Sequence, residues 1–470
     1  MPLSPKQIVS ALTEILGPDS VVSEPGRMAT YISEPRRRFH VPAVAVALPR
    51  EVGEVRQVMA WAYQNGVSVV PQAGNTGLVG GQVPLNGDEI IVSISRLRGA
   101  RHVDAAAGHM TLEAGTTLQE AHGIAEEAGM MFPLYIASQG SARIGGVLGT
   151  NAGGVQVLSY GNARELCLGV EAVLADGSLY SGLNALRKDN TGYDLKDLLV
   201  GSEGTLGIIT AATLKLFPKP DFYETAFLNV RSPEAALELF TRMRGRAGNT
   251  LTAFELMPRI GIALQLKHKM IAQDPAPEPS DWHVLVEISV PRGGAGGTLA
   301  AAVEEAFEEG LVTNGVIADS LKQREAFWRA REQMSAVQSR EGASIKHDVS
   351  VPVAAVPELI AQGIAAAEKI VPGIRAVPFG HLGDGNLHFN FSQPEGVDGA
   401  AFMAGAGPVH EAVYSVVRAL GGSVSAEHGI GQLKTALLEG VKDPVALSMM
   451  RAIKSALDPK GILNPGKLLG

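Results

Sequence analysis

The chain has 470 residues, of which 46% are hydrophobic and 19% are charged, a balance typical of a folded globular protein. This composition excludes disordered, collagen-like and coiled-coil chains. The net charge of −8 argues against a general nucleic-acid or anionic-membrane surface. The 55 glycines are a marked excess, and they predict long loops in which the backbone approaches a ligand closely.

The first 17 residues have neither the apolar run of a signal peptide nor the arginine and serine bias of a transit peptide. We therefore expect a cytoplasmic protein. The longest uncharged runs are rich in glycine and polar residues, so no transmembrane segment is expected. The single cysteine, Cys167, cannot form an internal disulfide and fits a reducing compartment.

The pattern of elements along the chain indicates an α+β protein. Ser4 before Pro5 predicts the start of a short amphipathic helix that ends near Gly17. Short β-branched runs at 67–70, 90–94 and 169–174 follow, with glycine-rich loops and a helix near 118–128. Beyond the proline punctuation at 218–220, strands at 222–230 and 284–290 alternate with helices around a surface loop at 273–280. We expect domains at 1–218 and 219–408 and a helical segment at 409–470.

Three glycine-rich segments in the first domain, at 71–81, 140–154 and 201–209, could bind a pyrophosphate through backbone N–H groups. No G-x-G-x-x-G opens a helix with an acidic residue about twenty positions further on, which argues against a Rossmann fold. Alone, each segment could equally be an ordinary loop. Two such loops in one domain favour a large dinucleotide.

A second set of candidate residues surrounds a Gly-Asp-Gly turn. Leu387, Phe389 and Phe391 alternate with polar residues, so a strand is expected to present His388 and Asn390 on its other face. His381 and His388 bracket the turn and can converge on one ion, for which Glu427 supplies the carboxylate. A hairpin with a solvated polar face is the alternative. These ligands accept zinc, manganese or cobalt.

Cationic residues form the third set. Arg331 and Ser335, four residues apart, lie on one edge of a predicted helix between 320 and 340, and Lys346 falls on a predicted strand. Taken singly, each is a solvated side chain.

The three glycine-rich loops resemble the flavin-binding domain of the vanillyl-alcohol oxidase and para-cresol methylhydroxylase group. The segments 187–196 and 422–431 resemble the D-2-hydroxyglutarate dehydrogenase family more specifically. This resemblance implies an FAD-binding domain of the vanillyl-alcohol oxidase type, a substrate domain with an antiparallel sheet, and a C-terminal helical segment that returns to the FAD domain. Some members of the group attach flavin to a histidine where this chain has Asn75, so the FAD is expected to be non-covalent.

The resemblance also implies roles for individual residues. Zinc is expected at His381, His388 and Glu427, the substrate at Arg331, Ser335, Lys346, Asn390 and His428, with His428 as the catalytic base. The residues expected to bind FAD are Pro71, Gly74, Asn75, Thr76, Gly77, Leu78, Gly140, Ser141, Gly145, Gly146, Asn151, Gly153, Gly204, Ile209 and Asn464.

The implied activity is FAD- and metal-dependent oxidation of D-2-hydroxyglutarate to 2-oxoglutarate, with D-malate as a further substrate. Two fixed cations beside a metal suit a dicarboxylate. Electrons are expected to leave through an electron-transfer flavoprotein, and a homodimer is expected. The alternatives are a D-lactate or glycolate dehydrogenase of the same family and a non-catalytic flavin-binding subunit. The complete set of His381, His388, Glu427 and His428 argues against the non-catalytic alternative.

Overall fold

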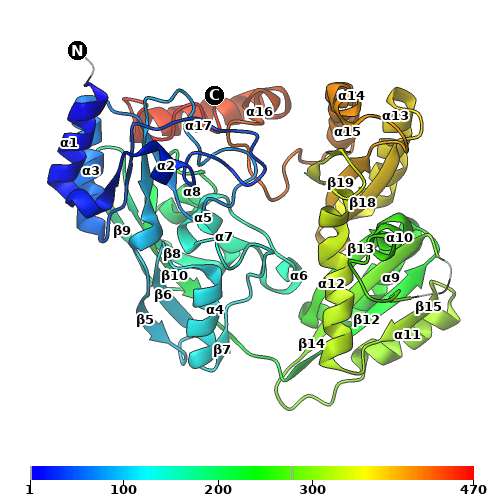
Figure 1. The fold of residues 1–470 in the computed structure, drawn as a ribbon. Coiled ribbons are helices and arrows are strands. Elements are labelled where there is room, and N and C mark those ends of the chain that lie inside the picture. Colours follow the sequence, from blue (N-terminus) through cyan, green and yellow to red (C-terminus); the bar gives the residue numbers. More distant parts are fainter. Residues whose placement is uncertain (1–2, 277, 279) are drawn as a thin grey trace. The chain divides into compact units, whose positions relative to one another are not determined.

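The computed structural model describes residues 3–276, 278 and 280–470, and the chain divides into two compact units (Figure 1). Unit 1 consists of Met1–Gly154, Gly161–Pro218 and Glu427–Gly470. Unit 2 consists of Val155–Tyr160 and Lys219–Ala426. The chain therefore passes between the units four times. Within the loop expected at 273–280, residues 277 and 279 lie outside the described residues.

Unit 1 is built on two sheets and one short strand pair. The order of the first sheet is β1-β2-β4-β3, with β2, β4 and β3 parallel, and the second sheet is antiparallel with the order β5-β6-β10-β8-β9. The strands are β1 (Val21–Val22), β2 (Ala45–Ala47), β3 (Val69–Gln72), β4 (Ile90–Ser93), β5 (Ala100–Asp104), β6 (His109–Glu113), β7 (Met130–Met131), β8 (Cys167–Val173), β9 (Leu179–Gly182), β10 (Ile208–Lys215) and β11 (Phe217–Pro218).

Some helices of unit 1 begin at side-chain caps. Ser4 and Gln7 form a capping box before the first helix, and Thr117 and Glu120 form another before α4. The helices are α1 (Pro5–Leu16), α2 (Pro25–Met28), α3 (Val52–Asn65), α4 (Leu118–Glu127), α5 (Ile144–Gly149), α7 (Ala163–Leu166), α8 (Leu195–Leu199), α16 (Thr435–Val441) and α17 (Pro444–Leu457). The helices expected from Pro5 and near 118–128 are confirmed.

Unit 2 contains one eight-stranded sheet in which the neighbouring strands are antiparallel. The strand order is β15-β12-β14-β13-β18-β19-β16, and β17 also pairs with β19. The strands are β12 (Phe222–Val230), β13 (Leu251–Pro258), β14 (Trp282–Val290), β15 (Val312–Ile317), β16 (Ser344–Ile345), β17 (Asp348–Ser350), β18 (Arg375–His381) and β19 (Asn386–Ser392). Lys346, expected on a strand, lies instead between β16 and β17, because the chain leaves the pairing with β19 there.

Helices cover both faces of the unit 2 sheet. They are α6 (Val157–Tyr160), α9 (Pro233–Ala247), α10 (Arg259–Lys267), α11 (Thr298–Glu308), α12 (Leu321–Gln338), α13 (Val356–Ile370), α14 (Gly399–Ala404) and α15 (Ala406–Ala419). Phe227, Met257 and Phe379 of the sheet share a buried cluster with Phe327 and Met334 of α12. Since side chains alternate along a strand, this α12 face also carries residues 255, 381, 388 and 390.

The architecture confirms the α+β class expected from the sequence, with an antiparallel sheet in the second unit. Among the described residues, none of the helices combines the length and the apolar character needed to cross a membrane.

Candidate functional site

The glycine-rich loops of unit 1 meet one another through backbone contacts. A Cβ atom on Gly74 would lie 2.2 Å from the carbonyl oxygen of Ser141, so only glycine lets the loop after β3 approach the loop before α5. A Cβ on Gly146 would lie 3.1 Å from Ala73, and one on Gly204 would lie 3.1 Å from Pro71. The three loops identified in the sequence therefore form one continuous lining.

Non-glycine residues with left-handed backbone conformations are concentrated in the same lining. Asn75, Asn151, Glu203 and Asn464 have φ angles of 52°, 51°, 53° and 48°. This conformation is uncommon outside glycine and marks sites where a turn is imposed by its surroundings.

The side chains of two of these asparagines, Asn75 and Asn464, indicate what kind of ligand the lining could hold. Asn75 Nδ2 donates to the carbonyls of Thr30 and Ser33 at 2.8 and 2.9 Å, and Asn464 Nδ2 donates to the carbonyls of Gly81 and Glu203 at 3.0 and 2.8 Å. The Oδ1 atoms of both asparagines are buried acceptors without a partner among the described residues. Because buried acceptors are normally satisfied, a ligand with hydroxyl or N–H donors fits this lining.

Several expected FAD residues lie in this lining, although the backbone contacts above involve only some of them. Thr76, Gly77, Leu78 and Asn151 are partly exposed and Gly140 is exposed, whereas Ile209 is buried in β10. A Cβ on Gly145 would lie 2.6 Å from Ile94 Cδ1, so this glycine serves packing beneath the loop.

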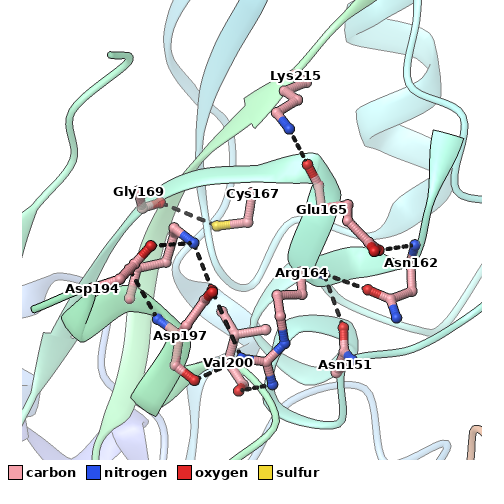
Figure 2. A network of polar contacts seen from close by, with 11 residues as sticks. Asn151, Asn162, Arg164, Glu165, Cys167, Gly169, Asp194, Asp197, Val200 and Lys215 are labelled. Atoms are coloured by element: carbon pink, nitrogen blue, oxygen red, sulfur yellow. Dashed lines mark hydrogen bonds and ion pairs between the residues drawn. The ribbon is translucent and has the colours of Figure 1, made fainter. Parts of the chain in front are cut away.

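Arg164 holds the loop around Asn151 in place and was missed by the sequence analysis (Figure 2). Its backbone N–H donates to Asn151 Oδ1 at 2.9 Å, and its guanidinium donates to the carbonyls of Asp197 and Val200 at 2.7 and 2.8 Å. The two carbonyls belong to the segment 197–200, which leads into the third glycine loop. The capping box of Asn162 and Glu165 around α7 was the available sequence signal.

Glu203 was also missed, and it fixes the turn that carries Glu427 and His428. Its carboxylate accepts the backbone N–H groups of Ile430 and Gly431 at 2.8 and 2.7 Å. Burial raises the pKa of the Glu203 carboxyl, and the two N–H groups oppose that shift. Glu203 therefore joins the third glycine loop to this turn within unit 1.

A glycine of the second loop lies next to the same turn. A Cβ on Gly153 would lie 2.9 Å from Glu427 Oε1, so the absence of a side chain there leaves room for the carboxylate. Glu427 and His428 are both partly exposed.

In unit 2 the structure brings His381 and His388 together. His381 ends β18, and His388 of β19 is paired with Phe379, so both rings project from the α12 face of the sheet. The ring centroids are 5.9 Å apart, and one nitrogen of each ring lies within 4.8 Å of the other. The polar face of β19 is covered rather than solvated, since Asn390 is 2% exposed.

Glu255 of β13 orients His381, and no sequence motif marked it. Its Oε1 lies 2.5 Å from His381 Nδ1, and its Oε2 accepts a hydrogen bond from Arg331 Nε. Burial raises the pKa of the Glu255 carboxyl, but the charges of Arg331 and His381 outweigh burial and hold that pKa at about 2. An ionised Glu255 fixes Nδ1 of His381 as the donor, which leaves Nε2 as the atom able to bind an ion.

The remaining expected substrate residues gather along α12. Lys346 Nζ donates to Ser335 Oγ at 3.0 Å and to the Ser335 carbonyl at 3.1 Å. Asn390 Nδ2 donates to Gln338 Oε1 at 3.0 Å, whereas Asn390 Oδ1 is buried without a partner in the part of the chain described. Arg331 differs from the other three because its guanidinium is paired with a buried carboxylate, that of Glu255.

Two family models match the chain. Residues 43–182 match an FAD binding domain, and residues 219–468 match the C-terminal domain of FAD linked oxidases. The chain is 37% identical over 446 residues to the D-2-hydroxyglutarate dehydrogenase of Xanthomonas citri pv. viticola, covering 95% of this chain and 93% of the relative. It is 37% identical over 462 residues to the mitochondrial D-2-hydroxyglutarate dehydrogenase of Rattus norvegicus, covering 98% and 84%.

Solved structures share the fold at low sequence identity. p-Cresol methylhydroxylase with substrate bound matches with a TM-score of 0.77 and 17% identity, covering 99% of this chain and 96% of the other. Alkyldihydroxyacetonephosphate synthase matches with a TM-score of 0.74 and 16% identity, covering 99% and 85%. These matches confirm the FAD-binding fold of the vanillyl-alcohol oxidase type that the glycine loops predicted.

Proposed function

The chain belongs to the D-2-hydroxyglutarate dehydrogenase family of FAD-dependent dehydrogenases, and we propose that it oxidises D-2-hydroxyglutarate to 2-oxoglutarate. The observation that carries this proposal is the α12 face of the unit 2 sheet, where His381 and His388 lie on neighbouring strands. Lys346 with Ser335 supplies a cation and a hydroxyl on the same unit, and Asn390 Oδ1 supplies an unsatisfied acceptor.

We propose that His381, His388 and Glu427 hold a divalent cation, with zinc as the first choice among ions that accept nitrogen and oxygen ligands. Chain connectivity supports Glu427 as the third ligand. The N–H of Ala426 donates to the carbonyl of Asp348 at 3.4 Å, and Asp348 is paired with His388 across β17 and β19. Glu427 is the next residue after Ala426. The ion would polarise the substrate hydroxyl as a Lewis acid.

In the proposed reaction the C2–H bond and the hydroxyl O–H bond break, and a C2=O bond forms. His428 accepts the hydroxyl proton, because a neutral imidazole nitrogen can act as a general base. FAD, when bound, would supply the two-electron oxidant, so that the C2 hydrogen can leave with its electron pair. The lining formed by the glycine-rich loops, including Gly74, Asn75, Gly153 and Asn464, would hold this FAD without a covalent bond.

Lys346 and Ser335 bind a substrate carboxylate in this proposal, because a primary ammonium and a hydroxyl both donate to carboxylate oxygens. Arg331 supplies positive charge near His381 while its Nε is engaged by Glu255. The electron acceptor that reoxidises the flavin is proposed to be an electron-transfer flavoprotein, by analogy with the family.

The proposal is tested by turnover of D-2-hydroxyglutarate, D-malate, D-lactate and glycolate with an artificial electron acceptor. We expect the highest kcat/KM for D-2-hydroxyglutarate and a lower value for D-malate. A higher value for D-lactate or glycolate would replace the proposed substrate by a monocarboxylate. Absence of flavin bleaching with all four acids would overturn the proposed 2-hydroxy acid chemistry.

A further inference from the structure

A second group of metal-binding side chains lies on the β5–β6 hairpin of unit 1, far in sequence from the residues discussed above. It consists of His102, Asp104 and His109, which we name the hairpin cluster. Each residue offers one ligand atom, and these atoms all lie within 4.8 Å of one another. The separation suits simultaneous binding to one ion.

Strand geometry explains why the three side chains converge. His102 and Asp104 are two residues apart on β5 and therefore project from the same face. His109 of β6 is the antiparallel partner of Asp104, so its side chain projects from that face as well. The intervening Val103 pairs with the buried Met110 on the opposite face. The apolar alternation that anchors the hairpin in unit 1 thus fixes the cluster on the outer face.

The turn of the hairpin holds the carboxylate in place. Asp104 Oδ1 accepts the N–H of Ala107 at 2.8 Å, and the Asp104 carbonyl accepts the N–H of Gly108 at 2.9 Å. The Ala107 N–H lowers the pKa of the Asp104 carboxyl, with smaller contributions from the two histidines. The turn residues at 105–107 are alanines, so their side chains offer no competing ligand.

The lysine on the strand next to β6 is directed to a partner outside the cluster. Lys215 of β10 is the register partner of His109. Its Nζ donates to the carbonyl of Glu165 at the end of α7, as Figure 2 shows. The position of the Lys215 ammonium is therefore explained by its hydrogen bond to this carbonyl and requires no ion pair with Asp104.

We propose that the hairpin cluster is a binding site for a late first-row divalent cation of the zinc type. Two imidazoles and one carboxylate suit zinc, cobalt or nickel, whereas calcium and magnesium require sites rich in oxygen ligands. Three protein ligands leave coordination positions for water, because a closed structural zinc site normally has four. The ion would join the edge strand β5 to β6 and thereby stabilise the hairpin.

The site is tested on the full-length FAD-loaded protein by measuring bound zinc per chain after equilibrium dialysis against zinc. The double variant His102→Gln/His109→Gln is compared with wild type and with His40→Gln, which changes an exposed histidine of unit 1 outside the cluster. Asp104→Asn is a further variant, since the amide oxygen can still accept the Ala107 N–H and preserve the turn. The catalytic metal site proposed above is unchanged in all four proteins.

We expect the double variant to bind one zinc ion fewer per chain than wild type, and Asp104→Asn to bind zinc at this site more weakly. Added zinc should raise the Tm of wild type and His40→Gln more than that of the double variant, because an ion that binds only the folded state stabilises it. Equal zinc content in wild type and both hairpin variants would overturn the proposal. So would the same loss in His40→Gln, since that result would indicate general surface histidine binding.

Discussion

Replacement of Gly74 by alanine tests whether the glycine-rich loops form one lining for FAD. The added Cβ would lie 2.2 Å from the Ser141 carbonyl oxygen and 3.0 Å from Ala142 Cα. Since Cβ contacts under 3.0 Å essentially never occur, one loop must move by about 0.8 Å, the difference between 2.2 and 3.0 Å. Both contacts are with backbone atoms, so a change of side-chain rotamer cannot relieve them.

The cost of such overpacking is about 1–3 kcal/mol, which corresponds to a decrease in Tm of roughly 2–12 °C for a unit of this size. The matched control is Gly123→Ala in α4, where a Cβ meets nothing within 4 Å. Alanine in a helix interior is more stable than glycine by about 0.5–1 kcal/mol, so the control should change in the opposite direction.

The assay is the ratio of absorbance at 450 nm to that at 280 nm after gel filtration, together with the Tm of the same samples. We expect Gly74→Ala to lose FAD and Gly123→Ala to retain it. If Gly74→Ala keeps both the FAD content and the Tm of wild type, the close approach of the loops does not determine flavin binding, and the reasoning is refuted.

Four further predictions concern the proposed metal, the base and the buried ion pair. Chelation should abolish turnover and leave FAD bound, as measured by elemental analysis and flavin absorbance; full activity of metal-free protein would remove the metal from the mechanism. His428→Asn should slow anaerobic flavin bleaching by about 10²- to 10⁴-fold with FAD and metal contents unchanged, and a wild-type rate would place the proton elsewhere. Arg331→Ala leaves Glu255 buried without its arginine partner and should lower the free energy of urea unfolding by about 3–5 kcal/mol. The control Arg329→Ala, on the exposed side of α12, should change that free energy little. Because the pKa of Glu255 is lowered from 4.5 to about 2, its contribution to stability is complete above pH 4.5 and is lost as the pH falls through about 2. Glu255→Gln should therefore flatten the dependence of unfolding free energy on pH in this range, and an unchanged pH profile would contradict the assignment.

The sequence was sufficient to predict elements whose pattern is local. Leu387, Phe389 and Phe391 alternate strictly with polar residues, and β19 covers this stretch. The burial of the polar face could not be predicted from the same pattern. Asn390 is covered because Gln338 at the end of α12 reaches it, and this contact joins residues 52 positions apart.

Glu255 and Glu203 illustrate why the supporting residues were missed. A glutamate within a short segment is normally a solvated charge, so neither has a local signature. Glu255 is 1% exposed because its partners, Arg331 and His381, come from elements 76 and 126 residues away. Glu203 receives its two N–H donors from a turn 227 and 228 residues further along the chain. Only the tertiary fold brings these partners together.

Two of the proposed site residues lie next to points where the chain passes from one unit to the other. Gly153 lies just before the passage at 154–155, and Glu427 lies directly after the passage at 426–427. On the unit 2 side, Ala426 is hydrogen-bonded to Asp348 beside His388; on the unit 1 side, Glu203 binds the backbone of Ile430 and Gly431. Ala426 is therefore anchored within unit 2, and Ile430 and Gly431 are anchored within unit 1. Because these contacts use backbone N–H groups of residues 426, 430 and 431, the His428→Asn substitution is expected to leave them in place, so that a slower flavin bleaching would report on the proposed base and not on loss of the turn.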